Sequence, residues 1–337
     1  MRGLWMLLIE GFQPTRLQSD QSRPPFKTSL FDGKPIDHPG TDTVDTDELT
    51  YAVDRLIRDG GVKVLTTTGS FGEFHTLLWD EHKKLIEATV AAVKKRVPLF
   101  VGCTNLNPRE AIRQAKFAQE VGADGLLLGV PFYYQATVDN AVQFYHDVAE
   151  ALPKMGVMIY HNPTHHRVTI PVGAFKKITD KPNIVGMKDS HRAPLQFVEL
   201  CNLTKGKMSI FVNQTQMFPY YQLGAAGCWS FNVWMGPSPV VTLRDACLAQ
   251  DWKAAKQICL DLEGLNRVGP NIGNLTWREN VFKLSVNEAG YCTAGPLRAP
   301  WRIIPQEVKD NSKKIAGYWK GLCEKYPMAA EQARKTA

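Results

Sequence analysis

The sequence predicts an α/β fold, a (β/α)8 TIM barrel with a C-terminal helical extension. From residue 45 onward, short apolar runs alternate with amphipathic stretches, which is the pattern of repeated βα units over a parallel sheet. Eight such units over roughly 250 residues match the size of a barrel. A doubly wound open sheet is the alternative, but it normally carries a Gly-rich phosphate loop after its first strand, and this sequence has none there.

Apolar runs of strand length supply the barrel strands. Seven of them lie at residues 62–68, 98–103, 125–129, 157–160, 184–188, 208–212 and 227–231. A helix predicted over 43–58 needs a strand before it, and the strong apolar run in that part of the chain is 4–12. We therefore expect eight parallel strands, with 4–12 as the first.

Helical patterns follow the strands. One covers 80–96, and another covers 108–121, where Asn107 suits the N-cap and Pro108 the first helical position. Beyond about residue 250 only helical patterns remain, at 253–265, 275–288 and 306–326. The chain is thus divided into an irregular N-terminal segment with the first strand (1–42), the barrel (43–250) and the helical extension (251–337).

Composition and charge argue against several classes of protein. The 337 residues are 44% hydrophobic and 22% charged, which is ordinary for a globular chain and not for a disordered one. Lys+Arg exceed Asp+Glu by 40 to 33, a net charge of +7 that is spread along the chain rather than gathered in a basic patch. We expect no nucleic-acid partner.

Cysteine usage and the N-terminus bear on location. Seven scattered cysteines without C-x-x-C or zinc-like spacing predict reduced thiols in a cytoplasmic protein. The apolar stretch 3–9 is too short to cross a bilayer, and no small-residue cleavage site follows it. We expect neither a membrane partner nor a signal peptide.

Two residues at strand ends carry the predicted chemistry, because catalytic groups of a TIM barrel lie at the C-terminal ends of its strands. Lys188 ends the run 184–188, so its ammonium enters the barrel mouth, where desolvation would lower its pKa and yield the neutral amine that forms a Schiff base. Tyr160 ends the preceding strand and brings a proton-transferring phenol to the same mouth. Position alone leaves two alternatives open, a lysine that points to water and a tyrosine that only caps the core.

A third feature follows the run 62–68. In residues 69–73 (GSFGE), two glycines around a hydroxyl let backbone N–H groups converge on an anion, and the Ser70 hydroxyl adds a donor for a carboxylate. A tight turn without a ligand has a similar sequence, so this motif alone does not decide.

Together these motifs resemble the signature of the dihydrodipicolinate synthase and N-acetylneuraminate lyase superfamily. That signature is G-[ST]-x-G-E after the second strand, Tyr-x-x-Pro ending the fifth, and G-x-K-[DE]-[AST] ending the sixth. The chain carries all three, at residues 69–73 (GSFGE), 160–163 (YHNP) and 186–190 (GMKDS). Order, strand assignment and spacing agree over residues 43–300.

The resemblance implies a role for each of these residues. Lys188 is the Schiff-base lysine for a 2-oxo acid, and Tyr160 is the proton-transferring phenol. Ser70, with the Ser70 and Phe71 backbone amides, is the clamp on the substrate carboxylate. The resemblance also implies a homo-oligomer, a tetramer, and no cofactor beyond the covalent Schiff base on Lys188.

Departures from the synthase pattern narrow the resemblance. Phe71 replaces the second hydroxyl residue of the synthase turn, and residues 164–166 (THH) stand where the synthases place an arginine for the second substrate. The GSFGE turn, with residues 41–45, 100–107 and 289–296, instead resembles the hydratase-aldolases of naphthalene and polycyclic aromatic catabolism. Those enzymes cleave a 4-aryl-2-oxobut-3-enoate, such as trans-o-hydroxybenzylidenepyruvate or trans-2'-carboxybenzalpyruvate, to an aromatic aldehyde and pyruvate.

Aromatic residues at or just beyond strand ends are the expected wall for an aryl substrate. The predicted aryl pocket comprises Trp229, Trp234, Phe132 and Tyr134, with Phe71, Tyr133 and Phe231 at similar positions. Tyr133 also resembles the tyrosine that completes the proton relay of the synthases, for which Tyr134 is the alternative. The candidates to hydrogen-bond an ortho substituent are Asn213, Asn232, Asn271 and Asn274, and the sequence does not choose among them.

Two alternatives to a hydratase-aldolase remain open. One is another pyruvate-dependent aldolase, either a sugar-acid lyase or a dihydrodipicolinate synthase-like enzyme, although a sugar acid calls for polar groups where this wall is aromatic. The other is a non-catalytic 2-oxo-acid-binding regulator, against which the presence of both Tyr160 and Lys188 argues. A metal site at His161, His165 and His166 is disfavoured, because no carboxylate or cysteine accompanies them at ligand spacing.

Overall fold

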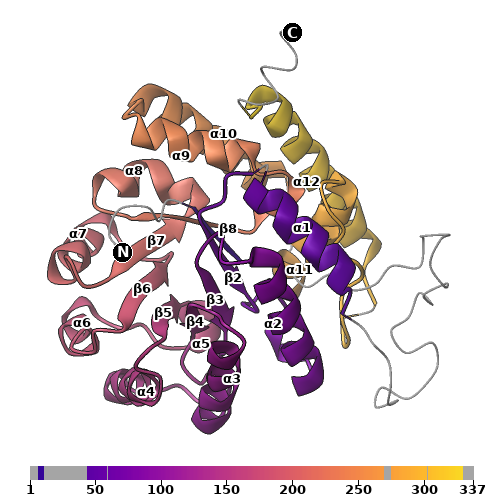
Figure 1. The fold of residues 1–337 in the computed structure, drawn as a ribbon. Coiled ribbons are helices and arrows are strands. Elements are labelled where there is room, and N and C mark those ends of the chain that lie inside the picture. The colour runs from indigo at the N-terminus through magenta and orange to yellow at the C-terminus, as the bar shows by residue number, and fades with distance from the viewer. Residues whose placement is uncertain (1–6, 11–43, 59, 269–274, 302, 329–337) are drawn as a thin grey trace.

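A parallel sheet ringed by helices forms the centre of the protein (Figure 1). The computed structural model describes residues 7–10, 44–58, 60–268, 275–301 and 303–328. Strand β1 (Leu7–Glu10) pairs in parallel with both β2 (Val64–Thr67) and β8 (Gly227–Ser230), which closes the sheet in the order β1 to β8. The predicted α/β fold is confirmed, and the first strand lies within the run 4–12. The rest of the predicted N-terminal segment lies outside the described residues.

The remaining strands begin and end within about two residues of the predicted runs. They are β3 (Leu99–Gly102), β4 (Gly125–Leu128), β5 (Gly156–His161), β6 (Ile184–Asp189) and β7 (Ser209–Asn213). Each pairs in parallel with its neighbours in sequence order. All the C-terminal strand ends therefore open at one mouth.

Helices cover the outside of the sheet. They are α1 (Thr46–Arg58), α2 (Trp79–Val93), α3 (Pro108–Glu120), α4 (Val138–Ala151), α5 (Pro163–His166), α6 (Phe175–Ile178), α7 (Pro194–Leu203), α8 (Met217–Gln222) and α9 (Ser238–Leu248), with short 3-10 turns η1 (Phe74–Thr76), η2 (Val172–Ala174), η3 (Gln214–Gln216) and η4 (Asn232–Met235). The N-cap predicted for α3 is confirmed, because Asn107 Oδ1 accepts the Arg109 N–H at 3.0 Å and Pro108 follows it.

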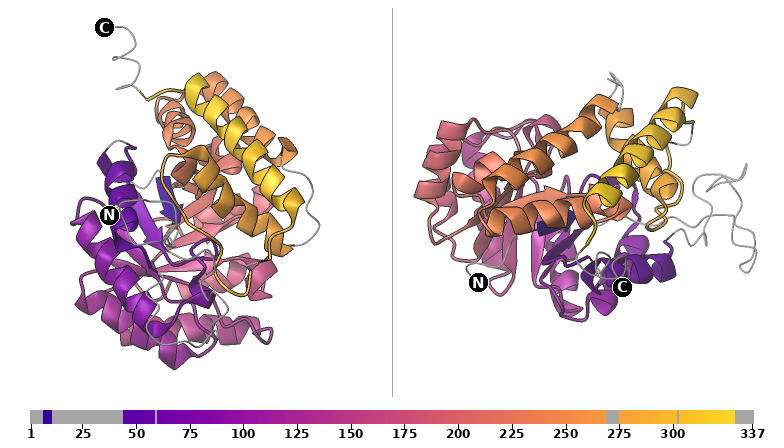
Figure 2. Two further views of the ribbon diagram at one scale, coloured as in Figure 1. Left: turned by 90° about the vertical axis from the view of Figure 1, so that its right-hand side faces the viewer. Right: turned by 90° about the horizontal axis from the view of Figure 1, so that it is seen from above.

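Three helices follow the barrel in the chain: α10 (Trp252–Val268), α11 (Leu275–Ala289) and α12 (Gln306–Lys325). They pack on one another at one side of the barrel, as the orange and yellow ribbons of Figure 2 show. Helix α11 also contacts η4, at the end of the eighth strand. This extension therefore lies where it can influence the barrel mouth.

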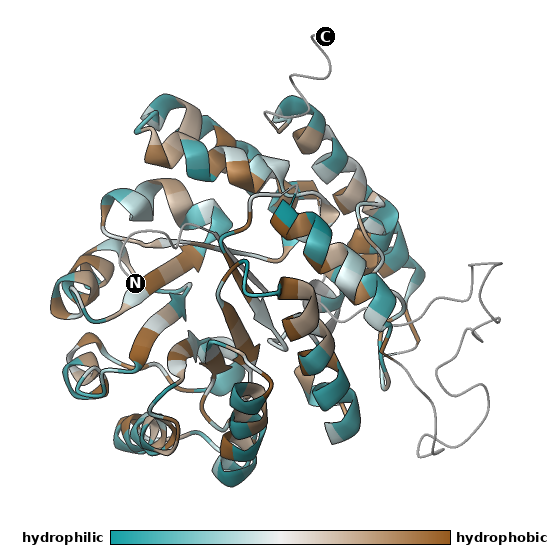
Figure 3. Ribbon diagram, viewed as in Figure 1, coloured by the Kyte–Doolittle hydropathy of each residue, from teal (hydrophilic) through white to brown (hydrophobic). Residues whose placement is uncertain are grey.

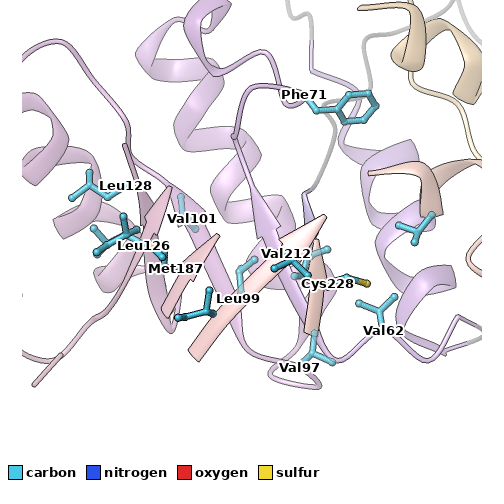
Figure 4. Close-up of a cluster of buried hydrophobic side chains, with 14 of the residues drawn as sticks. Val62, Phe71, Val97, Leu99, Val101, Leu126, Leu128, Met187, Val212 and Cys228 are labelled. Carbon is cyan, nitrogen blue, oxygen red and sulfur yellow. The ribbon is translucent and has the colours of Figure 1, made fainter. Parts of the chain in front are cut away.

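The core has two layers because successive strand residues face opposite sides of the sheet. The inner cluster fills the barrel and consists of Val64, Phe100, Leu127, Met158, Tyr160, Phe211 and Trp229. Neighbouring residues such as Leu99 and Val101 point outward into the core shared with the helices (Figure 4). Figure 3 shows that the central strands are mostly apolar, whereas the helices around them carry both apolar and polar residues. Among the described helices, none is long and apolar enough to cross a membrane.

Candidate active site

Tyr160 and Lys188 lie side by side at the C-terminal ends of β5 and β6, where they are register partners. Strand alternation turns both toward the barrel interior, since Tyr160 belongs to the inner cluster with Met158 two residues before it. Lys188 is only 7% exposed, and its Nζ lies 5.6 Å from the centroid of the Tyr160 ring. Nζ also donates a hydrogen bond to Ser190 Oγ at 3.0 Å. The lysine therefore does not point to bulk water.

Tyr160 is held on three sides. Its ring is stacked on Trp229, with centroids 5.6 Å apart and planes 11° apart, and meets the His166 ring edge-on at 5.3 Å. Its hydroxyl shares a hydrogen bond with Ser70 Oγ at 3.1 Å, in which either oxygen can donate. With the ring fixed in this way, the hydroxyl is the group of Tyr160 that could exchange a proton with a ligand in the mouth.

The turn after β2 brings Ser70 to this phenol. Two residues that flank it, Thr68 and Glu73, have φ of 56° and 49°, which is the left-handed region that L-residues seldom adopt. Phe71 is buried and stacks on Phe231, with centroids 4.9 Å apart. The Glu73 N–H donates to Ser70 O at 3.1 Å and closes the turn. Phe71 thus anchors the turn with its side chain, which leaves only its backbone for a ligand.

His166 packs against Tyr160, a contact that the sequence did not indicate. It is buried on α5, and its ring lies against Gly129 at the end of β4, where an added Cβ would be 2.3 Å from His166 Cε1. Burial lowers the pKa of His166 to about 4, so the ring is neutral at pH 7. A glycine directly after an apolar strand was the available signal for a side chain packed there.

A charged cluster lies on the outward side of the same strand ends. Asp189 is fully buried and accepts hydrogen bonds from Arg192 Nε at 2.6 Å and from the His191 N–H at 3.2 Å. His161 Nδ1 lies 3.7 Å from Asp189 Oδ2, and His161 Nε2 accepts the Ile170 N–H at 3.1 Å. Spacing along the sequence showed no carboxylate for His161, but the pairing of β5 with β6 places Asp189 beside it.

The donor set of this cluster can be compared with a metal site. The ligand atoms of His161, Asp189 and His191 lie within 4.8 Å of one another. Burial opposes ionisation of Asp189, but His161, His191 and Arg192 hold the pKa of its carboxyl well below the usual range. Because the Arg192 guanidinium already neutralises this carboxylate, the cluster fits an ion pair that fixes the end of β6 better than it fits a metal.

A cavity of about 530 Å³ lies between the segments that follow β4 and β5. Its lining residues are Phe132, Tyr133, Tyr134, Thr164, His165 and Arg167. The ring centroid of Phe132 lies 6.1 Å from that of His166, and the His166 ring in turn meets that of Tyr160. The aryl-pocket residues Phe132 and Tyr134 therefore lie at one cavity, with a cationic guanidinium at its rim.

Tyr133 does not meet Tyr160 in the described contacts. It is 68% exposed, and its ring packs edge-on against that of Tyr134, which is 83% exposed. Its carbonyl accepts a hydrogen bond from Arg167 Nη1 at 3.1 Å. Among the described contacts, Ser70 rather than Tyr133 is the partner of the Tyr160 hydroxyl. The relay role of Tyr133 stays a prediction.

Trp234 does not lie where the predicted aryl pocket requires it. It lies on η4, is 0% exposed and belongs to the outer core. Its carbonyl accepts a hydrogen bond from Cys292 Sγ at 3.2 Å. Trp229, five residues earlier, faces the barrel interior instead. The two tryptophans differ because the strand ends at Ser230 and the following 3-10 turn faces the extension.

The candidate asparagines are also separated by the fold. Asn213 ends β7 and is half-buried, whereas Asn232 is buried on η4. Asn232 Oδ1 has no hydrogen-bond partner among the described residues. Asn271 and Asn274 lie outside the described residues.

The sequence did not reveal the partner of Glu73. Lys283, on α11, forms a buried ion pair with it from 210 positions along the chain. A lysine that shares a helix face with the apolar Val286 was the only local signal of burial.

Comparisons with known proteins identify the family of this chain. A sequence model of the dihydrodipicolinate synthetase family matches residues 34–315. The trans-o-hydroxybenzylidenepyruvate hydratase-aldolase of Sphingobium xenophagum is 33% identical, over 84% of this chain and 88% of its own length. The trans-2'-carboxybenzalpyruvate hydratase-aldolase of Nocardioides sp. is 28% identical, over 85% and 88% respectively. A solved structure, PhdJ bound to a substrate intermediate, is 30% identical with a TM-score of 0.83, and covers 96% of this chain and 97% of that chain.

Proposed function

Because this chain belongs to the dihydrodipicolinate synthetase family, we propose that it is a Schiff-base hydratase-aldolase that cleaves a 4-aryl-2-oxobut-3-enoate to an aromatic aldehyde and pyruvate. The observation that carries the proposal is the convergence of Lys188, Tyr160 and Ser70 in one barrel mouth. The aromatic surface beside them and the relatives that are hydratase-aldolases support the aryl substrate.

The first step joins substrate to enzyme. The neutral amine of Lys188 attacks the C2 carbonyl, and loss of water leaves a protonated imine. The Ser70 hydroxyl and the backbone of its turn hold the carboxylate on C1, and Tyr160 passes protons to and from the departing oxygen. The imine is the electron sink for every later step, so the proposed reaction requires no cofactor.

Water then adds across the conjugated alkene, with the hydroxyl on C4 and the proton on C3. Tyr160 removes the proton of this hydroxyl, the C3–C4 bond breaks, and the aromatic aldehyde leaves. The electron pair of the broken bond forms a C2–C3 double bond, and the imine becomes an enamine. Protonation of the enamine at C3 and hydrolysis release pyruvate and restore Lys188. Hydration consumes one water, and the water lost on imine formation returns on hydrolysis.

The cavity lined by Phe132, His165 and Arg167 suggests which aryl substrates are preferred. Phe132 offers an aromatic face, while Arg167 and His165 place basic groups at the rim. An anionic ortho substituent on the ring, such as a carboxylate, gains a charge-assisted hydrogen bond there that a neutral substituent does not. We therefore expect the carboxylated class of aryl substrate to be favoured.

Reductive trapping tests the proposal. Incubation with pyruvate and borohydride should attach a reduced adduct to Lys188, identified by peptide mass mapping, and Lys188→Ala should abolish both the adduct and turnover. Benzylidenepyruvates should lose their near-ultraviolet absorbance and release pyruvate, whereas N-acetylneuraminate and aspartate semialdehyde should not be turned over. An adduct on another lysine, or none, would refute the Schiff-base mechanism, and cleavage of a sugar acid without activity on the aryl enone would favour the other aldolase class.

A further inference from the structure

We propose that the C-terminal extension positions the carboxylate clamp of the active site through the buried pair of Lys283 and Glu73. This inference rests on the proposed function, because the clamp is the Ser70 turn that holds the carboxylate of a 2-oxo acid. In this arrangement Lys283 is a positioning residue, since it acts through Glu73 and Ser70 and does not touch the substrate.

The extension binds both carboxylate oxygens of Glu73. Its Oε2 accepts a hydrogen bond from Lys283 Nζ on α11, and its Oε1 accepts the Arg298 N–H at 3.0 Å. Lys283 Nζ also donates to Pro296 O at 2.9 Å, so the helix and the segment after it grip the carboxylate together. The two paired side chains are only 2% and 3% exposed.

Arg298 also holds the two elements that follow the turn, η1 and α2. Its Nε donates to Thr76 Oγ1 at 3.1 Å, and its Nη2 donates to Glu81 Oε1 at 2.6 Å. The chain from the clamp to the start of α2 is therefore bound to the extension at Glu73, Thr76 and Glu81. These contacts join motifs that are more than two hundred residues apart in the sequence.

A short path leads from Glu73 to the reacting groups. The Glu73 N–H donates to Ser70 O at 3.1 Å, and Ser70 Oγ is hydrogen-bonded to Tyr160 Oη at 3.1 Å. Glu73 itself has φ of 49°, a conformation that persists only where its surroundings impose it. If the Glu73 backbone relaxed from this conformation, the N–H that binds Ser70 O would move. The Ser70 hydroxyl would then lose its position beside Tyr160.

The physical character of the pair favours positioning over simple stabilisation. Burying two charges is costly, and an apolar pair of similar size is often as stable. A buried pair does, however, resist displacement, because a small separation leaves two poorly solvated charges. Burial also keeps Lys283 away from any ligand, so it cannot replace Lys188 as the amine that forms the imine.

Trapping on the full-length protein tests this inference. Borohydride trapping at Lys188 is titrated with pyruvate and, in parallel, with acetone, a ketone that lacks the carboxylate. In Lys283→Met the half-saturating pyruvate concentration should rise by about tenfold, which is the low end of a charge-assisted hydrogen bond, while that for acetone stays within about twofold of wild type. In a Ser70→Ala background the same substitution should raise half-saturation by a smaller factor than in wild type, because the hydroxyl of the clamp is already absent and only its backbone amides remain to be displaced.

Two further variants complete the test. Lys325→Met removes another ion pair of the extension, to Asp261 at 2.6 Å, that does not contact the turn, and should leave pyruvate saturation unchanged. If Lys283→Met does not fold, Glu73→Gln, which keeps the length of the side chain and removes the charge that Lys283 pairs with, should raise half-saturation by about threefold. Unchanged pyruvate saturation in the folded variant, or equal losses for pyruvate and acetone, would overturn the inference. Absence of any Lys188 adduct in wild type would instead refute the proposed function.

Discussion

Replacement of Tyr160 by phenylalanine separates two roles that its hydroxyl can play. The ring is almost fully buried between Trp229 and His166, so Phe keeps the stacking and edge contacts and removes only the oxygen. That oxygen makes a hydrogen bond with Ser70 Oγ at 3.1 Å. The substitution therefore tests the hydroxyl without opening a cavity.

The expected magnitude distinguishes the roles. Loss of one neutral hydrogen bond costs about 0.5–1.5 kcal/mol, which is roughly 2- to 13-fold in rate. Loss of a general acid–base costs about 10²–10⁴-fold, or roughly 2.7–5.5 kcal/mol. We expect kcat of Tyr160→Phe to fall by at least about 100-fold, because each turnover needs several proton transfers at this position.

Two assays on the same variant decide the question. Turnover is followed by loss of the near-ultraviolet absorbance of a benzylidenepyruvate, and imine formation by borohydride trapping at equilibrium, which should largely survive. Ser70→Ala is the matched control, since it breaks the same hydrogen bond and leaves the phenol in place. A loss in Tyr160→Phe no larger than the loss in Ser70→Ala would refute proton transfer and make Tyr160 a support for the clamp.

Two other predictions concern the cavity rim and pH. Arg167→Gln should lower kcat/KM for a 2'-carboxy substrate by about tenfold, because one charge-assisted hydrogen bond is lost, and kcat/KM for the 2'-hydroxy analogue by less than about twofold. Equal losses for the two substrates would contradict the assignment of Arg167, as would a loss in the exposed control Arg113→Gln. Burial lowers the pKa of His82 and His166 to about 4 from 6.5, so the folded state binds fewer protons than the unfolded state below pH 6.5. Their contribution to stability is complete above pH 6.5 and is lost as pH falls toward 4, by about 1.4 kcal/mol per histidine per pH unit, and a urea midpoint that is equal at pH 7 and pH 5 would exclude it.

The alternating pattern was sufficient for the fold because the side-chain period of a strand decides which residues face the barrel. Tyr160 and Lys188 each end an apolar run, and the parallel register of β5 and β6 then makes them partners. Trp234 was misassigned by the same reasoning, since it lies just past the end of β8, where the period of a strand no longer applies. A residue near a strand end can be assigned to the barrel mouth from its sequence position only if it still belongs to the strand.

By itself the sequence determined the strand order, the inward faces and the motif residues Ser70, Tyr160 and Lys188, because these depend on local periodicity and on short spacings. Only the tertiary structure decided what surrounds them. Lys283 reaches Glu73 across 210 residues, and Asp189 meets His161 through strand pairing. Such contacts depend on how helices and strands pack on one another, and burial then selects a charged partner for each charge, wherever in the chain that partner lies.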